Sequence, residues 1–116
     1  MFRNIFKRIF NLIIKPVWST NEVLRLIYLH YSNIWFEDKF GFLKIERSSF
    51  KPQTDDLRRI WDNISKSKPK VCLEYGSGIS SVVILDAMST YKSKSKLISI
   101  ESTKKWANNT RKMILN

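Results

Sequence analysis

The first segment of the chain, residues 1–18, repeats apolar and polar positions with the period of an α-helix. One face collects the apolar side chains Phe2, Ile5, Phe6, Ile9, Phe10, Leu12 and Ile13. The other face carries lysine and arginine but no acidic residue, and Pro16 ends the pattern. We therefore predict a basic amphipathic helix whose apolar face lies on a membrane surface or packs against protein.

The second segment, residues 19–69, begins with another helical pattern. Ser19 and Glu22 have the spacing of a capping box. An apolar stripe follows them: Val23, Leu24, Ile27, Tyr28 and Tyr31. Within this stripe His30 is expected to be structural, because an isolated histidine on a helical stripe is more often core than catalytic.

The rest of the second segment changes character twice. Residues 34–46 are rich in aromatic side chains, which suggests a short hairpin with a bend at Phe40-Gly41. Thr54 is the expected cap of a further helix, whose inward face would be Leu57, Ile60, Trp61 and Ile64. We predict that residues 19–69 form a mainly helical N-terminal extension that ends in the polar linker 66–70.

The third segment, residues 70–116, alternates short strand patterns with helical ones. Strand candidates at residues 71–73 and 97–100 flank a glycine turn and a helical run that reaches Met88. Glu101 follows the second strand, and Ser102 or Thr103 can cap a last helix. The order strand, glycine turn, helix, strand, acid, helix predicts an α/β fold, the βαβα beginning of a Rossmann-like parallel sheet.

Composition narrows the function classes. No run of about 18 uncharged apolar residues is present, so no transmembrane helix is predicted. One cysteine, Cys72, and one histidine provide neither an internal disulfide nor a metal site. We expect a cytoplasmic protein, with a possible peripheral position at the membrane. The net charge of +11 suits a nucleic acid, an anionic membrane or an acidic substrate, and chooses none of them.

The glycine turn has the chemistry of an adenosine-cofactor site. Without Cβ atoms, Gly76 and Gly78 let the backbone turn sharply and come into contact with a ligand. A helix beginning near Ser80 directs backbone N–H groups into the same space. An acid at the end of the second strand, here Glu101, can accept two hydrogen bonds from a ribose diol.

Glu74 indicates which type of adenosine cofactor the turn would bind. A carboxylate two residues before the first glycine would repel the pyrophosphate of a dinucleotide and attract the ammonium and sulfonium of S-adenosylmethionine. At about 6 Å and an effective dielectric constant near 20, the interaction energy of the carboxylate is roughly 3 kcal/mol in either case. It is unfavourable with the pyrophosphate and favourable with the cationic groups. The dinucleotide fingerprint also expects a third glycine where the chain has Ser81.

These residues resemble a known family. Glu74-Tyr75-Gly76-Ser77-Gly78, followed by residues 97–101 and a helix that contains Trp106, is similar to the first two motifs of class I S-adenosylmethionine-dependent methyltransferases. The resemblance covers residues 70–116. It implies that Glu74, Gly76, Ser77 and Gly78 line the methionine part of the cofactor and that Glu101 binds the ribose. Tyr75, within the same turn, is also expected to be a cofactor-binding residue. Ser80 departs from the common third glycine of the family.

The resemblance also implies that the chain is incomplete as an enzyme. The family's sheet has more strands than the two expected here, and its acceptor-binding loop has no counterpart in this sequence. A truncated frame, a split product whose fold a second polypeptide completes, or a decayed enzyme would each fit, and no catalytic residue can be named. The alternatives are a dinucleotide-binding fragment and a non-enzymatic basic module that associates with a membrane or nucleic acid. Lys92, Lys94 and Lys96 alternate with serines in what we expect to be a solvated loop.

Overall fold

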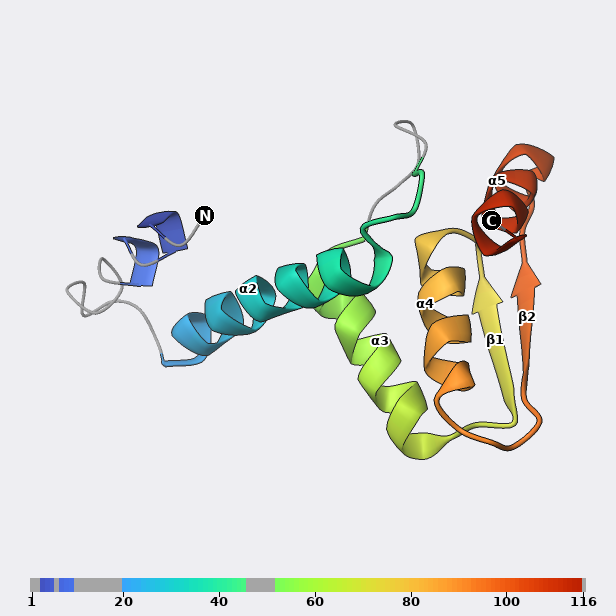
Figure 1. The fold of residues 1–116 in the computed structure, drawn as a ribbon, viewed down its shortest axis with the longest axis horizontal. Coiled ribbons are helices and arrows are strands. Elements are labelled where there is room, and N and C mark those ends of the chain that lie inside the picture. Colours follow the sequence, from blue (N-terminus) through green and yellow to red (C-terminus); the bar gives the residue numbers. More distant parts are fainter. Residues whose placement is uncertain (1–2, 6, 10–19, 46–51, 116) are drawn as a thin grey trace. The chain divides into compact units, whose positions relative to one another are not determined.

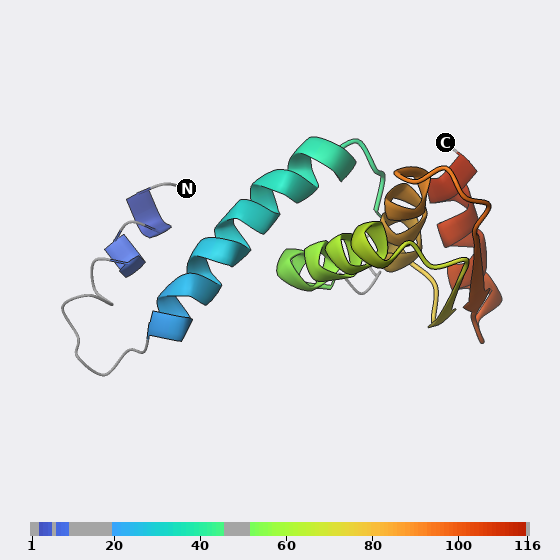
Figure 2. The ribbon, with the colours of Figure 1, turned by 90° about the horizontal axis from the view of Figure 1, so that it is seen from below.

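The computed structural model describes residues 3–5, 7–9, 20–45 and 52–115. The chain divides into two compact units, Met1–Gly41 and Phe42–Asn116. In the residues that the structure describes, the first unit is helical, whereas the second combines three helices with a small parallel sheet (Figure 1 and Figure 2). The fold is therefore mixed α/β, as expected in its coarse class.

The first unit contains the helix α2, Thr20–Phe40, and a helical stretch at residues 3–5 and 7–9. The remainder of the amphipathic helix expected over residues 1–18, and the capping residue Ser19, lie outside the described residues. Across the described parts of the chain, no helix is both long enough and apolar enough to cross a membrane.

The hairpin expected at residues 34–46 is wrong, because residues 34–40 continue α2. Phe36 and Phe40 are one helical turn apart, are both buried, and bring their ring centroids to 5.4 Å. An i, i+4 aromatic pair of this kind stabilises a helix, and it outweighed the β preference of single aromatic residues. The bend at Gly41 is confirmed: its N–H donates to the carbonyl oxygen of Glu37 at 3.0 Å, where the helix ends.

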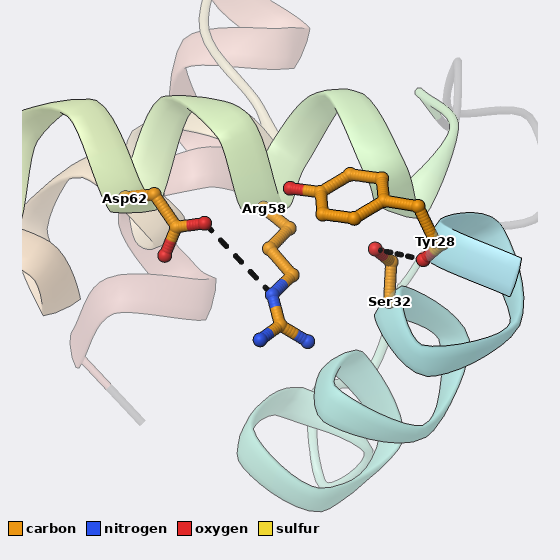
Figure 3. A network of polar contacts seen from close by, with 4 residues as sticks. All are labelled: Tyr28, Ser32, Arg58 and Asp62. Atoms are coloured by element: carbon orange, nitrogen blue, oxygen red, sulfur yellow. Dashed lines mark hydrogen bonds and ion pairs between the residues drawn. The ribbon is translucent and has the colours of Figure 1, made fainter. Parts of the chain in front are cut away.

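The apolar stripe predicted for α2 is also only partly buried. Leu24 and Tyr31 are more than half exposed, whereas His30 and Ser32 are buried. Ser32 donates its hydroxyl to the carbonyl oxygen of Tyr28 at 2.6 Å, one turn earlier, so its polar group is satisfied within the helix (Figure 3).

In the second unit, α3 covers Thr54–Ser67. Thr54 is its first helical residue, and the capping position is held by Gln53, whose backbone is extended and whose side chain makes no capping bond. The predicted cap is thus one residue late. Leu57 on the expected inward face is fully buried, and Lys68 ends the helix in the left-handed conformation. Within the same helix, Arg58 and Asp62 form a long i, i+4 ion pair at 3.9 Å (Figure 3).

Helix α3 packs on α4, Ile79–Ser89, which follows the glycine turn. The indole N–H of Trp61 donates to Asp86 Oδ2 at 2.7 Å and links the two helices. A helix from the expected N-terminal extension therefore shares a core with the α/β segment. The division into residues 1–18, 19–69 and 70–116 stays a prediction.

The sheet has two parallel strands, β1 (Val71–Tyr75) and β2 (Lys96–Ile100). Their register aligns Val71 with Lys96 and Tyr75 with Ile100, so both strands end at the same edge. α4 connects them, and α5, Lys104–Leu115, follows β2 (Figure 1). The predicted order of strand, turn, helix, strand and helix is confirmed among the described residues.

The two faces of the sheet differ in their surroundings. On one face Leu97 and Ser99 lie toward α4 and α5, and they border a space that Leu85 and Thr110 of these helices also line. The opposite face exposes five large apolar side chains: Val71, Leu73, Tyr75, Ile98 and Ile100. Parallel sheets are usually covered on both faces, whereas within the described residues this face is exposed.

Candidate functional site

The turn after β1 lies directly on the end of β2. The N–H of Gly76 donates to the carbonyl oxygen of Ile100 at 2.8 Å, which extends the pairing of the strands by one bond. Gly76 has a φ of +83°, a left-handed value that a side chain makes costly. Gly78, by contrast, has an extended φ of 161° and immediately precedes α4. The two glycines therefore serve different purposes: Gly76 is required by the backbone, and Gly78 is not.

Glu101 joins the two halves of this edge. Its Oε2 accepts from the backbone N–H of Ser77 at 2.7 Å and from the hydroxyl of Ser77 at 3.1 Å. Its Oε1 accepts from the N–H of Thr103 at 3.1 Å, just before α5. These bonds, led by the one from the Ser77 N–H, lower the pKa of Glu101 below the ordinary value. Glu101 is therefore a carboxylate at neutral pH.

Helix α5 is tied to the same turn. The hydroxyl of Thr110, which is buried, donates to the hydroxyl oxygen of Ser77 at 3.0 Å. The hydroxyl of Ser77 in turn donates to Glu101 Oε2, so Thr110, Ser77 and Glu101 form one chain of hydrogen bonds. This chain connects α5, the glycine turn and the end of β2.

A cavity of about 420 Å³ opens at this edge of the sheet. It is lined by the end of β1, the turn, the start of α4, the residue after β2, one face of α5 and one residue before α3: Tyr75, Gly76, Ser77, Gly78, Ile79, Ser80, Glu101, Trp106, Asn109, Thr110, Met113 and Pro52. Five of the six predicted cofactor-binding residues are among them, and Glu74 is not. The volume is within the range of small-molecule sites.

The sequence reasoning assigned no site role to the α5 residues. Trp106, Thr110 and Met113 are spaced by four and three residues, which places them on one helix face, and this spacing could have directed that face toward the strand ends. Lys105 holds its ammonium 4.8 Å from the centre of the Trp106 ring. Pro52 had no signal in the sequence, because it reaches the cavity through the packing of its own segment.

Glu74 lies beneath the turn rather than in the cavity. Its Oε1 accepts from the hydroxyls of Ser81 and Ser99, the latter at 2.8 Å, and its Oε2 accepts from Ser80 at 3.2 Å. Ser81 also accepts from the N–H of Gly78 at 3.1 Å. The carboxylate therefore holds the start of α4 and, through Ser81, the conformation of the turn.

The thiol of Cys72, two residues before Glu74, is affected by the negative charge of that carboxylate. Cys72 is half-buried, and its pKa is raised first by burial and then by the negative charge of Glu74. A raised pKa keeps the thiol protonated at neutral pH, which argues against a nucleophilic role. The described residues also hold no group of three or more His, Cys, Asp or Glu side chains that could bind a metal ion.

The hydrogen bonds of the turn amides bear on whether a pyrophosphate could bind at this turn. The N–H groups of Gly76, Ser77 and Gly78 donate to Ile100, Glu101 and Ser81 respectively. A dinucleotide site presents such amides to a pyrophosphate. Here three successive amides already have acceptors in the protein, and one of those acceptors is a carboxylate. The geometry is therefore unfavourable for a pyrophosphate.

Comparison of the chain with protein-family models, with curated proteins and with solved structures found no match. The functional assignment therefore depends on the residues and their geometry.

Proposed function

We propose that residues 70–116 are the S-adenosylmethionine-binding part of a methyltransferase-like protein and the beginning of a Rossmann-like sheet. The observation that supports this most strongly is the cavity at the carboxyl edge of the parallel strands, which is lined by the glycine turn and by Glu101. Ligands of open parallel sheets bind outside the carboxyl ends of the strands. The proposal concerns the binding of the methyl donor and names no catalytic residue.

The shape of the turn fits close approach by a ligand. A Cβ atom added at Gly76 or at Gly78 would meet no protein atom within 4 Å, so the space beside both residues is open. Trp106 and Met113 add apolar surface to the same cavity, which suits the adenosine portion of the cofactor.

Glu101 is the proposed ribose ligand. It accepts from Ser77 and Thr103 in the structure. A ribose diol would compete most easily with the hydroxyl of Ser77, because that group can rotate away while the backbone N–H of the same residue keeps its bond. The carboxylate would thus bind the ribose and hold the turn together.

Charge favours a cationic ligand. Glu101 lines the cavity, and Glu74 lies directly below the turn, so both carboxylates attract an ammonium or sulfonium group and repel a pyrophosphate. Glu74 would act on the ligand through long-range electrostatic attraction rather than by direct contact, because its oxygen atoms already accept hydrogen bonds from serine hydroxyls.

Calorimetric titration of the full chain with S-adenosylhomocysteine, the demethylated cofactor, tests the proposal. Gly78→Val fills the open space beside the turn at an extended backbone position, so we expect it to weaken binding at least about tenfold while the chain stays folded. Glu101→Gln should also weaken binding. Ser102→Ala, at the exposed neighbouring position, is the matched control and should bind as the wild type does. Equal affinity for all four proteins would reject the site.

A further inference from the structure

The structure brings two lysine-rich segments together at the other end of the sheet. Lys66, Lys68 and Lys70 lie at the end of α3 and in the linker to β1. Lys92 and Lys94 lie in the connection between α4 and β2, whereas Lys96, which was expected in the same loop, is the first residue of β2. All six residues are exposed. We call these six side chains the lysine cluster. In the sequence its two halves are more than twenty residues apart and look like two unrelated solvated segments.

Specific contacts hold the two halves side by side. The N–H of Lys96 donates to the carbonyl oxygen of Lys70 at 3.0 Å, and Val71 pairs with Lys96 in the sheet. The hydroxyl of Tyr91 donates to the carbonyl oxygen of Pro69 at 2.7 Å. Figure 1 shows the end of α3 and the α4–β2 connection meeting at the amino ends of both strands. Tertiary contacts, rather than closeness in the sequence, therefore bring the six lysines together.

The cluster has no acidic residue of its own. None lies between Asp62 and Glu74 or between Asp86 and Glu101 in the sequence. Of these four acids, Asp62 pairs with Arg58, Asp86 accepts from Trp61, and the two glutamates are held by the hydrogen bonds described above. Six cations concentrated at one end of the unit attract a surface of many negative charges.

Apolar surface next to the cluster favours a membrane over a nucleic acid. Lys96 is on the same sheet face as Ile98, and its partner Val71 continues that face to Leu73. These three apolar side chains are 42–54% exposed. A lipid interface accepts cations at its headgroups and apolar groups just below them. The surface of a duplex is mainly sugar and phosphate, so it offers much less apolar surface to a flat row of exposed aliphatic side chains.

The composition of the cluster agrees with this choice. The two segments that carry it, residues 66–70 and 91–96, contain no arginine and so lack the planar guanidinium groups that bind phosphates and bases bidentately. The aromatic residue of these segments, Tyr91, uses its hydroxyl to tie the two halves together. Single-stranded nucleic acids are usually bound by aromatic platforms beside cations.

We propose that the lysine cluster, with the adjoining exposed side chains of Val71, Leu73 and Ile98, docks the second unit on an anionic phospholipid surface. The surface lies at the amino ends of the strands, and the candidate cofactor cavity lies at their carboxyl ends. Docking therefore leaves the cavity open, and it does not depend on the proposed cofactor.

Sedimentation of the full chain with phospholipid vesicles tests the proposal. Vesicles of phosphatidylcholine with about 30% phosphatidylserine should bind the chain, and phosphatidylcholine alone should not. The triple variant Lys92→Gln, Lys94→Gln, Lys96→Gln should lose at least about tenfold in affinity. The triple variant Lys66→Gln, Lys68→Gln, Lys70→Gln should lose a similar factor. Raising the salt from about 0.1 M to about 0.5 M should release the wild type.

The matched control removes three exposed lysines elsewhere: Lys44→Gln, Lys104→Gln, Lys112→Gln. It has the same net charge as each cluster variant and should keep its affinity. Equal losses in all three variants would mean that net charge alone acts, and would overturn the proposal. Vesicle binding that disappears on deletion of residues 1–18 but survives both cluster variants would also overturn it. So would binding to duplex DNA without binding to vesicles.

The second arm examines the apolar contribution. Ile98→Gln keeps every charge, and we expect it to weaken binding to anionic vesicles several-fold while leaving any binding to duplex DNA unchanged. Unchanged vesicle binding by a folded Ile98→Gln chain would contradict the lipid assignment. Circular dichroism and thermal unfolding confirm that each variant is folded.

Discussion

The backbone N–H of Ser77 donates to Glu101 Oε2 across 2.7 Å, which joins the turn after β1 to the end of β2. The two residues are 24 positions apart in the sequence, and both line the cavity at the carboxyl ends of the strands. The carboxylate of Glu101 therefore stabilises the folded chain in the absence of any ligand. The same group is also the proposed ribose ligand, so stability and binding share one side chain.

The first prediction concerns pH. The pKa of Glu101 is lower in the folded chain than in the unfolded one, so the unfolded state takes up a proton first as the pH falls. The stabilising contribution of Glu101 is therefore complete above its unfolded pKa, about 4.3, and is lost as the pH drops through the folded value. Urea unfolding of the wild type and Glu101→Gln between pH 3 and pH 7, about the range set by carboxyl titration, measures this. The wild type should be the more stable at pH 7, and the difference should shrink toward pH 3. A difference that is independent of pH would contradict the assignment.

The second prediction separates the two glycines. Gly76→Ala places a side chain at a φ of +83° and should lower the free energy of unfolding by about 1–2 kcal/mol. Gly78→Ala is at an extended φ with open space around its Cβ, so stability should change by less than about 0.5 kcal/mol. Chemical denaturation of both variants gives the comparison. Equal destabilisation would show that the turn is not as described.

The third prediction concerns the serines around Glu74. Ser81 is 1% exposed, donates to Glu74 and accepts from the N–H of Gly78. Ser81→Ala leaves both groups without that partner and should cost about 1–3 kcal/mol of folding free energy. Ser80→Ala removes one longer bond from a half-exposed residue and should cost less than about 1 kcal/mol. If Ser80→Ala proved the more damaging change, the role given to Ser81 would be wrong.

The fourth prediction tests whether α3 belongs to the second unit. Trp61→Phe removes the indole N–H that bonds to Asp86 at 2.7 Å and should destabilise the unit by about 1–3 kcal/mol. Asp62→Asn, on the same helix, breaks only the 3.9 Å pair with Arg58 and should change stability by no more than about 0.5 kcal/mol. Differential scanning calorimetry of both variants compares them. An unchanged melting temperature in Trp61→Phe would separate α3 from the core of the unit.

Local pattern predicted the second unit well. The strands at residues 71–75 and 96–100 and the helices around them follow from short apolar runs, two glycines and a helical period, all of which act over a few residues. The aromatic part of α2 was missed because strand preference was read from single residues, while Phe36 and Phe40 stabilise a helix through their spacing. Periodicity was the better guide there.

The site was predicted in outline, and its details required three-dimensional contacts. A ligand site at the strand ends was predicted from Gly76, Gly78 and Glu101, because glycines allow close approach of a ligand and an acid can accept hydrogen bonds from it. The position of Glu74 did not follow from its place in the motif, because Ser99 on the neighbouring strand and Ser81 in α4 determine where its carboxylate lies. The lysine cluster likewise exists only because parallel pairing brings residues 66–70 and 92–96 to one end of the sheet.

The most direct test of the central proposal is calorimetric titration of the folded wild-type chain with S-adenosylhomocysteine and, separately, with NAD. We expect S-adenosylhomocysteine to bind with a stoichiometry of about one, because the proposal names a single site. NAD should bind far more weakly, because three successive turn amides already have acceptors and two carboxylates lie beside the turn. No heat with S-adenosylhomocysteine from a chain shown to be folded, or tighter binding of NAD, would contradict the proposal.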